Sequence, residues 1–223
     1  MTTRTLIDIW PFFGLTITTP RVTLTAPTDA LIVDLVDKAD DIHSPDWSPF
    51  AGSWSLEPAE KRATLIAQYH WDTRASLTPE KWSLPLAIIV DDEVVGVQGV
   101  AGTDFTKRRV AETGSWLGRA HQGTGIGTEA RRAILFLIFE GLGAQRAETE
   151  AYESNHASRR VTEKLGYQPN GETIEVRGDD KAERSIQFRL ERADWEKTRP
   201  DDITIDGLGP CLPLLGLGVP TGS

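Results

Sequence analysis

The fold is decided by the stretch Trp116-Leu117-Gly118-Arg119-Ala120-His121-Gln122-Gly123-Thr124-Gly125-Ile126-Gly127-Thr128-Glu129. This stretch reads as the end of a strand, a glycine-rich turn and the start of an amphipathic helix. Such a turn exposes unpaired backbone N–H groups at the positive end of a helix dipole, and glycine lets a phosphate come close. From Arg119 to Arg132 there are three arginines and one glutamate, in a chain of net charge −9. We therefore predict a phosphate-binding turn, although close packing alone would also explain the glycines.

The spacing of the glycines separates the known classes of phosphate-binding loop. No Lys followed by Ser or Thr comes after them, which excludes a P-loop. A dinucleotide fingerprint needs G-x-G-x-x-G, whereas here Gly123, Gly125 and Gly127 occupy every second position. Glu148 or Glu150 could supply the acidic residue that such a fold requires. A nucleotide-binding module is therefore an alternative.

Strands and helices alternate on both sides of this stretch. Thr28 is a suitable N-cap for a helix through Val36, and Pro58 suits the start of a helix that reaches Ala75. Further strands are expected at 21–24, 86–90, 94–101, 111–118, 146–152 and 184–190, and further helices at 126–141 and 157–165. This order predicts an α/β (α+β) fold with one central sheet of mixed direction, flanked by helices.

The composition limits the partners and the compartment. Lys and Arg number 24 against 33 Asp and Glu, which argues against non-specific binding to nucleic acid or to an anionic membrane. Cys211 is the single cysteine, so no intrachain disulfide forms. The longest apolar run of the body, Ala133–Phe139, is too short to span a bilayer. The four histidines are far apart, so no metal site is expected. We expect a cytoplasmic protein.

Residues 1–199 are predicted to form a single domain, with residues 200–223 as a Gly/Leu/Pro-rich C-terminal appendage. The leucines of the appendage are too apolar for a solvated tail, so we expect it to dock on its own domain or on a neighbouring subunit of a homo-oligomer. Within the domain, residues 41–54 form an aromatic-rich loop. Its rings either fix the loop to the core or form a wall of a pocket.

Four blocks of the sequence resemble the Gcn5-related N-acetyltransferase (GNAT) superfamily, in particular its RimL/RimJ-like branch, whose members acetylate ribosomal proteins. Residues 122–127 match the signature Q/R-x-x-G-x-G/A, and residues 155–167 look like the block N-x-x-S…E-K-L-G-[FY]. Residues 19–24 and 112–118 also resemble that branch, and the blocks stand in the family's order within about residues 19–192. The resemblance implies the GNAT fold, in which two central parallel strands splay apart.

The same resemblance implies an acyl-CoA-dependent N-acyltransferase, in the first place an N-acetyltransferase. The acceptor would be a primary amine of a protein N-terminus, a lysine or a small molecule, and the co-substrate acetyl-CoA or another acyl-CoA, without a metal. The pyrophosphate of CoA would lie on the backbone amides of Gln122, Gly123, Thr124, Gly125, Ile126 and Gly127. The pantetheine arm would pair with the main chain of Trp116, Leu117 and Gly118, where an N–H would polarise the thioester carbonyl. Asn155 would reach the same arm, or would cap the following helix.

Direct acyl transfer requires a neutral amine, so a base must remove a proton from the ammonium ion. By resemblance, Ser158 is the candidate acid or hydrogen-bond donor to the thioester sulfur. Glu112 is the candidate base, although it could equally be a solvated carboxylate at a strand end. Asp104, Glu150 and His43 are held in reserve.

Ser115 stands where relatives often have an aromatic residue, which would widen the acyl pocket. Succinyl-CoA is therefore an alternative donor, and its carboxylate would need a cation. The candidates for this cation are Lys81, Lys107, Arg108 and Arg109. A further alternative is a CoA-binding sensor that has kept the fold and lost catalysis.

Overall fold

Two long apolar strands form the centre of the sheet. In the computed structural model, which describes residues 3–45 and 47–218, β3 (Lys81–Val90) and β4 (Glu93–Thr103) form a hairpin. Asp91 and Asp92 occupy its turn with φ values of 48° and 64°, a region that Asp tolerates better than most residues. The hairpin is longer at both ends than the sequence predicts.

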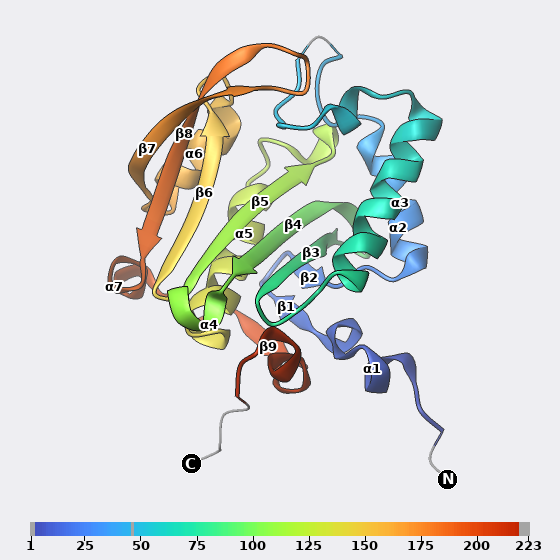
Figure 1. Cartoon of the computed structure of the whole chain (residues 1–223), viewed down its shortest axis with the longest axis vertical. Helices are drawn as coiled ribbons and strands as arrows, with labels where there is room; N and C mark the ends of the chain where they lie inside the picture. Colours follow the sequence, from blue (N-terminus) through green and yellow to red (C-terminus); the bar gives the residue numbers. More distant parts are fainter. Residues whose placement is uncertain (1–2, 46, 219–223) are drawn as a thin grey trace.

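Nine strands form one sheet in the order β7-β8-β6-β5-β4-β3-β2-β1-β9 (Figure 1). Only the pair β5–β6 is parallel among the described strands, so the predicted mixed sheet is confirmed. The remaining strands are β1 (Thr16–Thr18), β2 (Thr23–Thr25), β5 (Val110–Leu117), β6 (Arg146–Tyr152), β7 (Gln168–Val176), β8 (Ala182–Glu191) and β9 (Thr204–Asp206). The sequence did not predict β1, β7 or β9.

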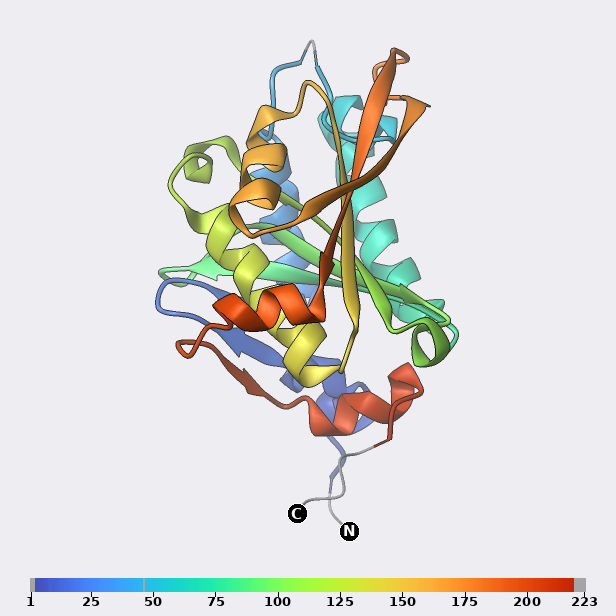
Figure 2. The same cartoon turned by 90° about the vertical axis from the view of Figure 1, so that its left-hand side faces the viewer.

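Helices cover both faces of the sheet (Figure 2). The helices α2 (Asp29–Ala39) and α3 (Ala59–Ala75) lie on one face, and α5 (Ile126–Phe136) and α6 (His156–Lys164) on the other. The hydroxyl of Thr28 accepts a hydrogen bond from Leu31 N, which confirms the predicted N-cap of α2. Within the described ranges, no helix has both the length and the apolar character to cross a membrane.

The apolar side of α5 lies at the centre of the core. Ala130, Ala133 and Ile134 are fully buried against the sheet, as the helical spacing predicts. The helix continues as one turn of π-helix, η4 (Leu137–Gly141). Three four-residue helices complete the fold, namely α1 (Leu6–Ile9), α4 (Phe105–Arg108) and α7 (Arg192–Trp195).

Residues 201–218 dock on the rest of the same domain. The strand β9 pairs antiparallel with β1 at the edge of the sheet, and the 3₁₀ helix η6 (Gly209–Leu215) follows. Cys211, Leu212 and Leu215 are buried in the main core. The predicted docking is therefore confirmed as an intramolecular one, and it explains the apolar composition of this segment.

We expect Leu215→Ala to reduce the free energy of unfolding by about 2–5 kcal/mol, because it leaves a cavity at a fully buried position. The matched control is Leu6→Ala, because Leu6 is 68% exposed and its truncation should change stability by less than about 0.5 kcal/mol. Urea denaturation of the two variants measures the difference. Equal midpoints for both variants would contradict the docking of the C-terminal segment.

Candidate active site

The two central parallel strands separate after a short pairing. β5 and β6 pair only through Val110, Ala111 and Glu112, opposite Arg146, Ala147 and Glu148. At the next position the hydroxyl of Thr149 donates to Thr113 O (2.8 Å), and the hydroxyl of Thr113 donates to Glu148 O (3.3 Å). Beyond these side-chain bonds the strands diverge and the sheet opens (Figure 1).

A buried arginine joins the separated strands. Arg131 of α5 is 3% exposed and donates to Gln98 Oε1 on β4 (3.3 Å), Ser115 Oγ on β5 (3.1 Å) and Thr149 Oγ1 on β6 (3.2 Å). Its planar fork of donors can satisfy all three acceptors at once. The sequence analysis did not identify this residue. The available signal was a charged residue beside the apolar positions of α5.

A cavity of about 1690 Å³ occupies the opening and extends from the start of α5 to α3. Most of the predicted site residues line it, namely Glu112, Trp116, Leu117, Gln122, Gly123, Gly125, Gly127, Asn155 and Ser158. Gly118, Thr124 and Ile126 are not among its lining residues. The structure thus brings both ends of the predicted site into one space.

The glycine-rich turn leaves the N-terminus of α5 open. Gly125 occupies the N-cap with φ 91°, and no side chain caps the helix. Gly123 also has a positive φ, 73°. The first N–H groups of a helix have no intrahelical partner, and at this end they favour an anion. The turn therefore has the geometry of a phosphate site.

The block Thr19–Leu24 fixes this turn from behind. Glu129, in the first turn of α5, is 7% exposed and accepts hydrogen bonds from Thr19 Oγ1 (2.7 Å) and from Arg21 N (2.9 Å) and Nε (2.7 Å). The guanidinium of Arg21 also contacts Thr124 O (3.4 Å). These contacts give a physical reason for a motif that the sequence could only match by resemblance.

The main chain of β5 offers hydrogen-bonding groups to the opening. Gly118 N donates to Val95 O on β4 (2.9 Å), and the directions of backbone groups alternate along a strand. Trp116 and Gly118 therefore present their main-chain groups to β4, whereas Ser115 and Leu117 present theirs to the open side. Of the residues predicted to pair with pantetheine, Leu117 faces the open side, whereas Trp116 and Gly118 face β4, and Ser115 is a further residue whose main chain faces the opening.

Asn155 and Ser158 stand at the start of α6. Asn155 Oδ1 accepts from Ser158 N (3.1 Å), so the alternative role of Asn155 as an N-cap is confirmed. Both residues also line the cavity. The cap fixes the orientation of the amide and leaves its NH₂ group directed to other partners.

The two ends of the cavity carry opposite charges. Arg119, Arg160 and Lys164 line the end near α5 and α6. Arg119 pairs with Asp41 (2.8 Å), whereas Arg160 and Lys164 form no ion pair with any described residue. Glu112, Glu148 and Glu150 line the other end. The cavity can thus hold an anion at one end and a cation at the other.

Three carboxylates lie close together at the acidic end. Glu112 and Glu148 are neighbours in the last pair of the β5–β6 ladder, and Glu150 follows on the same face of β6. Partial burial, which removes water from the carboxylate, raises the pKa of Glu150, and the negative charges of Glu175 and Glu112 raise it further. Among the reserve residues, Glu150 and His43 line the cavity, whereas Asp104 lies at the start of α4 and does not.

The cations predicted for a succinyl carboxylate lie elsewhere. Lys107 and Arg108 belong to α4, Arg109 follows it, and Lys81 begins β3. None of them lines the cavity, and α4 lies at the opposite end of β5 from the opening (Figure 1). This part of the prediction is wrong, because a basic turn before β5 cannot reach the end where β5 and β6 diverge.

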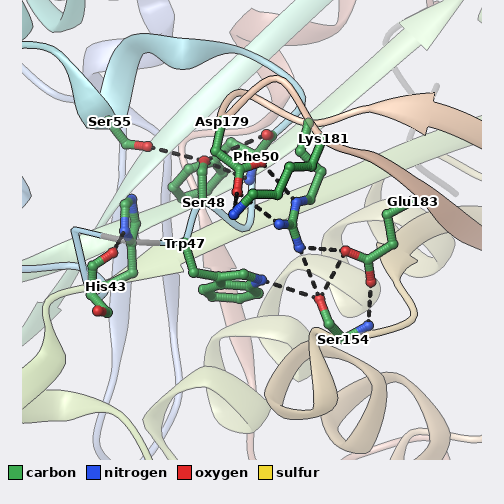
Figure 3. Close-up of polar contacts among 11 residues, drawn as sticks. His43, Trp47, Ser48, Phe50, Ser55, Ser154, Asp179, Lys181 and Glu183 are labelled. Carbon is green, nitrogen blue, oxygen red and sulfur yellow. Dashed lines mark hydrogen bonds and ion pairs between the residues drawn. The ribbon is translucent and has the colours of Figure 1, made fainter.

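The aromatic-rich loop lines the cavity and lies beside Ser154 and the β7–β8 hairpin (Figure 3), and we call it the roof of the cavity. Phe50 O accepts from Gly178 N of the β7–β8 hairpin (3.0 Å), and Trp47 Nε1 donates to Ser154 Oγ (3.1 Å). The ring of Phe50 packs on Trp54, which contacts Trp116 of β5. The loop is therefore both fixed to the core by its rings and a wall of the cavity.

The roof depends on a contact without side chains. Gly178 lies so close to the backbone of Gly52 that a Cβ atom would overlap it. Beside it, buried Arg177 pairs with Asp179 (2.7 Å) and Glu183 and donates to Ser154 Oγ (3.2 Å). Over residues 3–45 and 47–218, no group of three or more His, Cys, Asp and Glu side chains is arranged to hold a metal ion.

The comparisons with known proteins agree with this geometry. The family model described as "Acetyltransferase (GNAT) domain" matches residues 21–168. The chain belongs to the GNAT acetyltransferase family. The Bacillus subtilis protein named "Probable N-acetyltransferase YjcK" is 30% identical over 92 residues, which are 41% of this chain and 51% of that protein. The chain spans about half the length of the curated relatives it matches.

Solved GNAT structures share the fold. RimJ of Mycobacterium smegmatis, in complex with CoA-disulfide, superposes with a TM-score of 0.65 at 20% identity, over 81% of this chain and 88% of that one. The ribosomal L7/L12 alpha-N-protein acetyltransferase RimL, in complex with coenzyme A, gives 0.64 at 15% identity, over 79% and 97%. The recognised RimL/RimJ-like resemblance is thus confirmed at the level of fold.

We expect Gly125→Ala to weaken acetyl-CoA binding about 5- to 30-fold, because an L-residue at φ 91° is strained by about 1–2 kcal/mol. Its Cβ atom would also lie 3.2 Å from the Arg21 guanidinium. The control is Gly209→Ala, where an added Cβ meets nothing within 4 Å. Calorimetric titration with acetyl-CoA measures both. Unchanged affinity in Gly125→Ala would show that this turn does not hold the pyrophosphate.

Proposed function

We propose that this GNAT protein is an N-acetyltransferase that moves the acetyl group of acetyl-CoA directly to a primary amine. The observation that carries the proposal is the charge-separated cavity at the β5–β6 splay. An open helix N-terminus and unpaired cations lie at one end, and three carboxylates lie at the other. A polyanionic donor and a cationic acceptor thus have separate, complementary places. The CoA and acetyl-CoA present in structures of the same fold support this choice of donor.

The donor lies along β5 in this proposal. Its pyrophosphate accepts hydrogen bonds from the amides around Gly125, with Arg160 and Lys164 as nearby cations. The pantetheine arm pairs with the main chain of Ser115 and with Leu117 N, since Leu117 O already accepts a hydrogen bond from Gln122 Nε2 (2.8 Å). One of these N–H groups donates to the thioester oxygen and stabilises the negative charge that develops there.

The acceptor enters from the acidic end as an ammonium ion. Glu150 takes one proton from it, directly or through a water, because its raised pKa makes it a better base than an ordinary carboxylate. The neutral nitrogen then forms a bond to the thioester carbon and the carbon–sulfur bond breaks. The second proton lost by the nitrogen neutralises the leaving thiolate, and Ser158 Oγ donates a hydrogen bond to the departing sulfur. Glu112, the base predicted from the sequence, lies close enough to Glu150 to share this role.

The RimL neighbour is named as a ribosomal L7/L12 alpha-N-protein acetyltransferase. We extend this to a primary amine acceptor here, with a protein N-terminus as the first candidate. A homo-oligomer and a cytoplasmic location stay predictions. Succinyl transfer loses its support in the structure, because the cations proposed for it lie outside the cavity.

Glu150→Gln should lower kcat about 10²–10⁴-fold, as removal of a general base does, and should leave acetyl-CoA affinity unchanged. The base acts only when ionised, so kcat/KM of the wild type should fall as the pH decreases through the pKa of Glu150. Because that pKa is raised, this acid limb should lie above the ordinary glutamate value of 4.5. Release of CoA thiol over a panel of amines between pH 5 and 9 measures both effects.

Glu112→Gln is the matched comparison, since it removes the neighbouring carboxylate from the same wall. A larger loss in Glu112→Gln than in Glu150→Gln would assign the base to Glu112. Tight acetyl-CoA binding without thiol release for any amine would favour the sensor alternative over the enzyme.

A further inference from the structure

The acceptor end of the cavity carries more negative charge than one amine can neutralise. Glu148 pairs with Arg146 (3.5 Å), and Glu183 pairs with Arg177. Glu112, Glu150 and Glu175, by contrast, form no ion pair with any described residue. Uncompensated carboxylates in a partly enclosed space repel one another unless a cation joins them.

The carboxylates of Glu112, Glu150 and Glu175 surround the face of β6 that carries Glu150 and Tyr152. Glu150 and Tyr152 lie on the same face of β6, and Tyr152 stands opposite Ser185 of β8. In the β7–β8 ladder Thr173 stands opposite Ser185, which lines the cavity, and Glu175 lies on the same face two residues further along β7. The negative charges of Glu175 and of Glu112 both act on Glu150 and raise its pKa.

A buried, unpaired hydroxyl marks the same place. Tyr152 is 5% exposed and lines the cavity, yet its hydroxyl has no hydrogen-bond partner among the described residues. Burial raises its pKa, and the negative charges of Glu175 and Glu150 raise it further. Buried polar groups are nearly always paired, so a ligand group is the expected partner. The oxygen can accept a hydrogen bond from an ammonium or guanidinium group.

Among the described residues, none supplies an unpaired cation beside these carboxylates. Arg177, the basic residue that acts on Tyr152, is held by Asp179 and Glu183. His70 lines the cavity from α3, and burial, with a smaller effect of Arg74, lowers its pKa to about 4. Its ring is therefore neutral at physiological pH, and the missing positive charge must come from the ligand.

We propose that the acceptor is an amine that carries a second positive charge, which stays protonated during the reaction and is held by Glu175, Glu112 and the Tyr152 hydroxyl. The inference rests on the proposed function, since it extends the acceptor site of that reaction. When the reacting ammonium has passed its proton to Glu150, that pair is neutral and no longer balances the remaining carboxylates. Only a second cation that keeps its charge stabilises the transition state as well as the bound substrate.

The spacing of the two charges follows from screening. At physiological salt, charges interact appreciably within about 8 Å, so the second cation should lie within about that distance of the reacting nitrogen. A short diamine satisfies this requirement, and so does an N-terminal peptide with Lys or Arg near its α-amine. Both kinds of acceptor share one chemistry, a primary amine with a second cation within about 8 Å.

The first experiment compares acceptors that differ in one charge. The pairs are 1,4-diaminobutane against pentylamine, and Ala-Lys-Ala amide against Ala-norleucine-Ala amide, with acetyl-CoA at pH 8. We expect kcat/KM to be about tenfold or more higher for the dication of at least one pair, as for a charged hydrogen bond. The pair that shows the preference identifies the source as a small diamine or a basic peptide. Equal rates within both pairs would overturn the inference while leaving the proposed function intact.

The second experiment removes one charge of the site. Glu175→Gln should reduce the ratio of kcat/KM for the dication to kcat/KM for the monoamine about three- to tenfold, and this ratio cancels any effect of the lost charge on Glu150 itself. The control is Glu172→Gln, which makes the same charge change on the opposite face of β7, at a residue that pairs with Arg184 (3.5 Å). A preference that survives in Glu175→Gln, or falls equally in both variants, would contradict the assignment.

A third readout does not depend on turnover. Calorimetric titration of 1,4-diaminobutane and of the Lys peptide into the CoA-bound protein should give tighter binding than titration of their monocationic partners. If no amine is acetylated but a dication still binds more tightly, the proposed function fails and the cation site stands. If acetylation proceeds and no dication is preferred in rate or affinity, the proposed function stands and the second cation site is refuted.

Discussion

The early end of the β5–β6 ladder is the constraint on which the rest of the structure depends. Two parallel strands that stop pairing inside a sheet leave backbone groups without partners, and burying such groups is costly. Here the hydroxyls of Thr113 and Thr149 satisfy the first carbonyls. Arg131 then holds the diverging strands through Ser115 and Thr149. The main-chain groups that stay free on β5 are those that face the cavity, so the same break makes the opening and its hydrogen-bonding edge.

The charge of the chain is organised around this opening. A net charge of −9 opposes a polyanionic ligand at long range, yet the cavity offers helix-dipole amides and the cations Arg160 and Lys164 at one end. These local groups act at short distances, where they outweigh a diffuse and screened net charge. At the other end the cavity is lined by Glu112, Glu148 and Glu150, whose negative charges attract a cationic amine. One space can therefore bind two substrates of opposite charge without mixing their sites.

Much of this arrangement could be read from the sequence, and the failures have physical causes. The apolar spacing predicted α2, α5 and α6, because amphipathic helices leave a clear pattern, whereas α3 was predicted mainly from Pro58 at its start. Three-residue strands such as β1 and β9 leave none, and β7 contains Pro169 and Gly171, which argue against a strand. The glycine turn was found by its spacing. Arg131 was not, because its partners come from three strands that only the tertiary fold brings together. Proximity in sequence also misled, since Lys107–Arg109 precede β5 at the end away from the opening.

The roof connects the parts that the sequence treated as additions. Ser154 Oγ accepts from Trp47 and from Arg177 and donates to Glu183 (3.0 Å), so its one donor and both acceptor positions are used. The next residue, Asn155, caps α6 and sets the position of Ser158. A displacement of the loop or of the β7–β8 hairpin would therefore break a saturated network and move the start of α6. Because the hairpin also carries Glu175, the donor side and the acceptor side of the cavity are coupled through Ser154. The loop therefore helps to fix the cavity in position, in addition to closing one side of it.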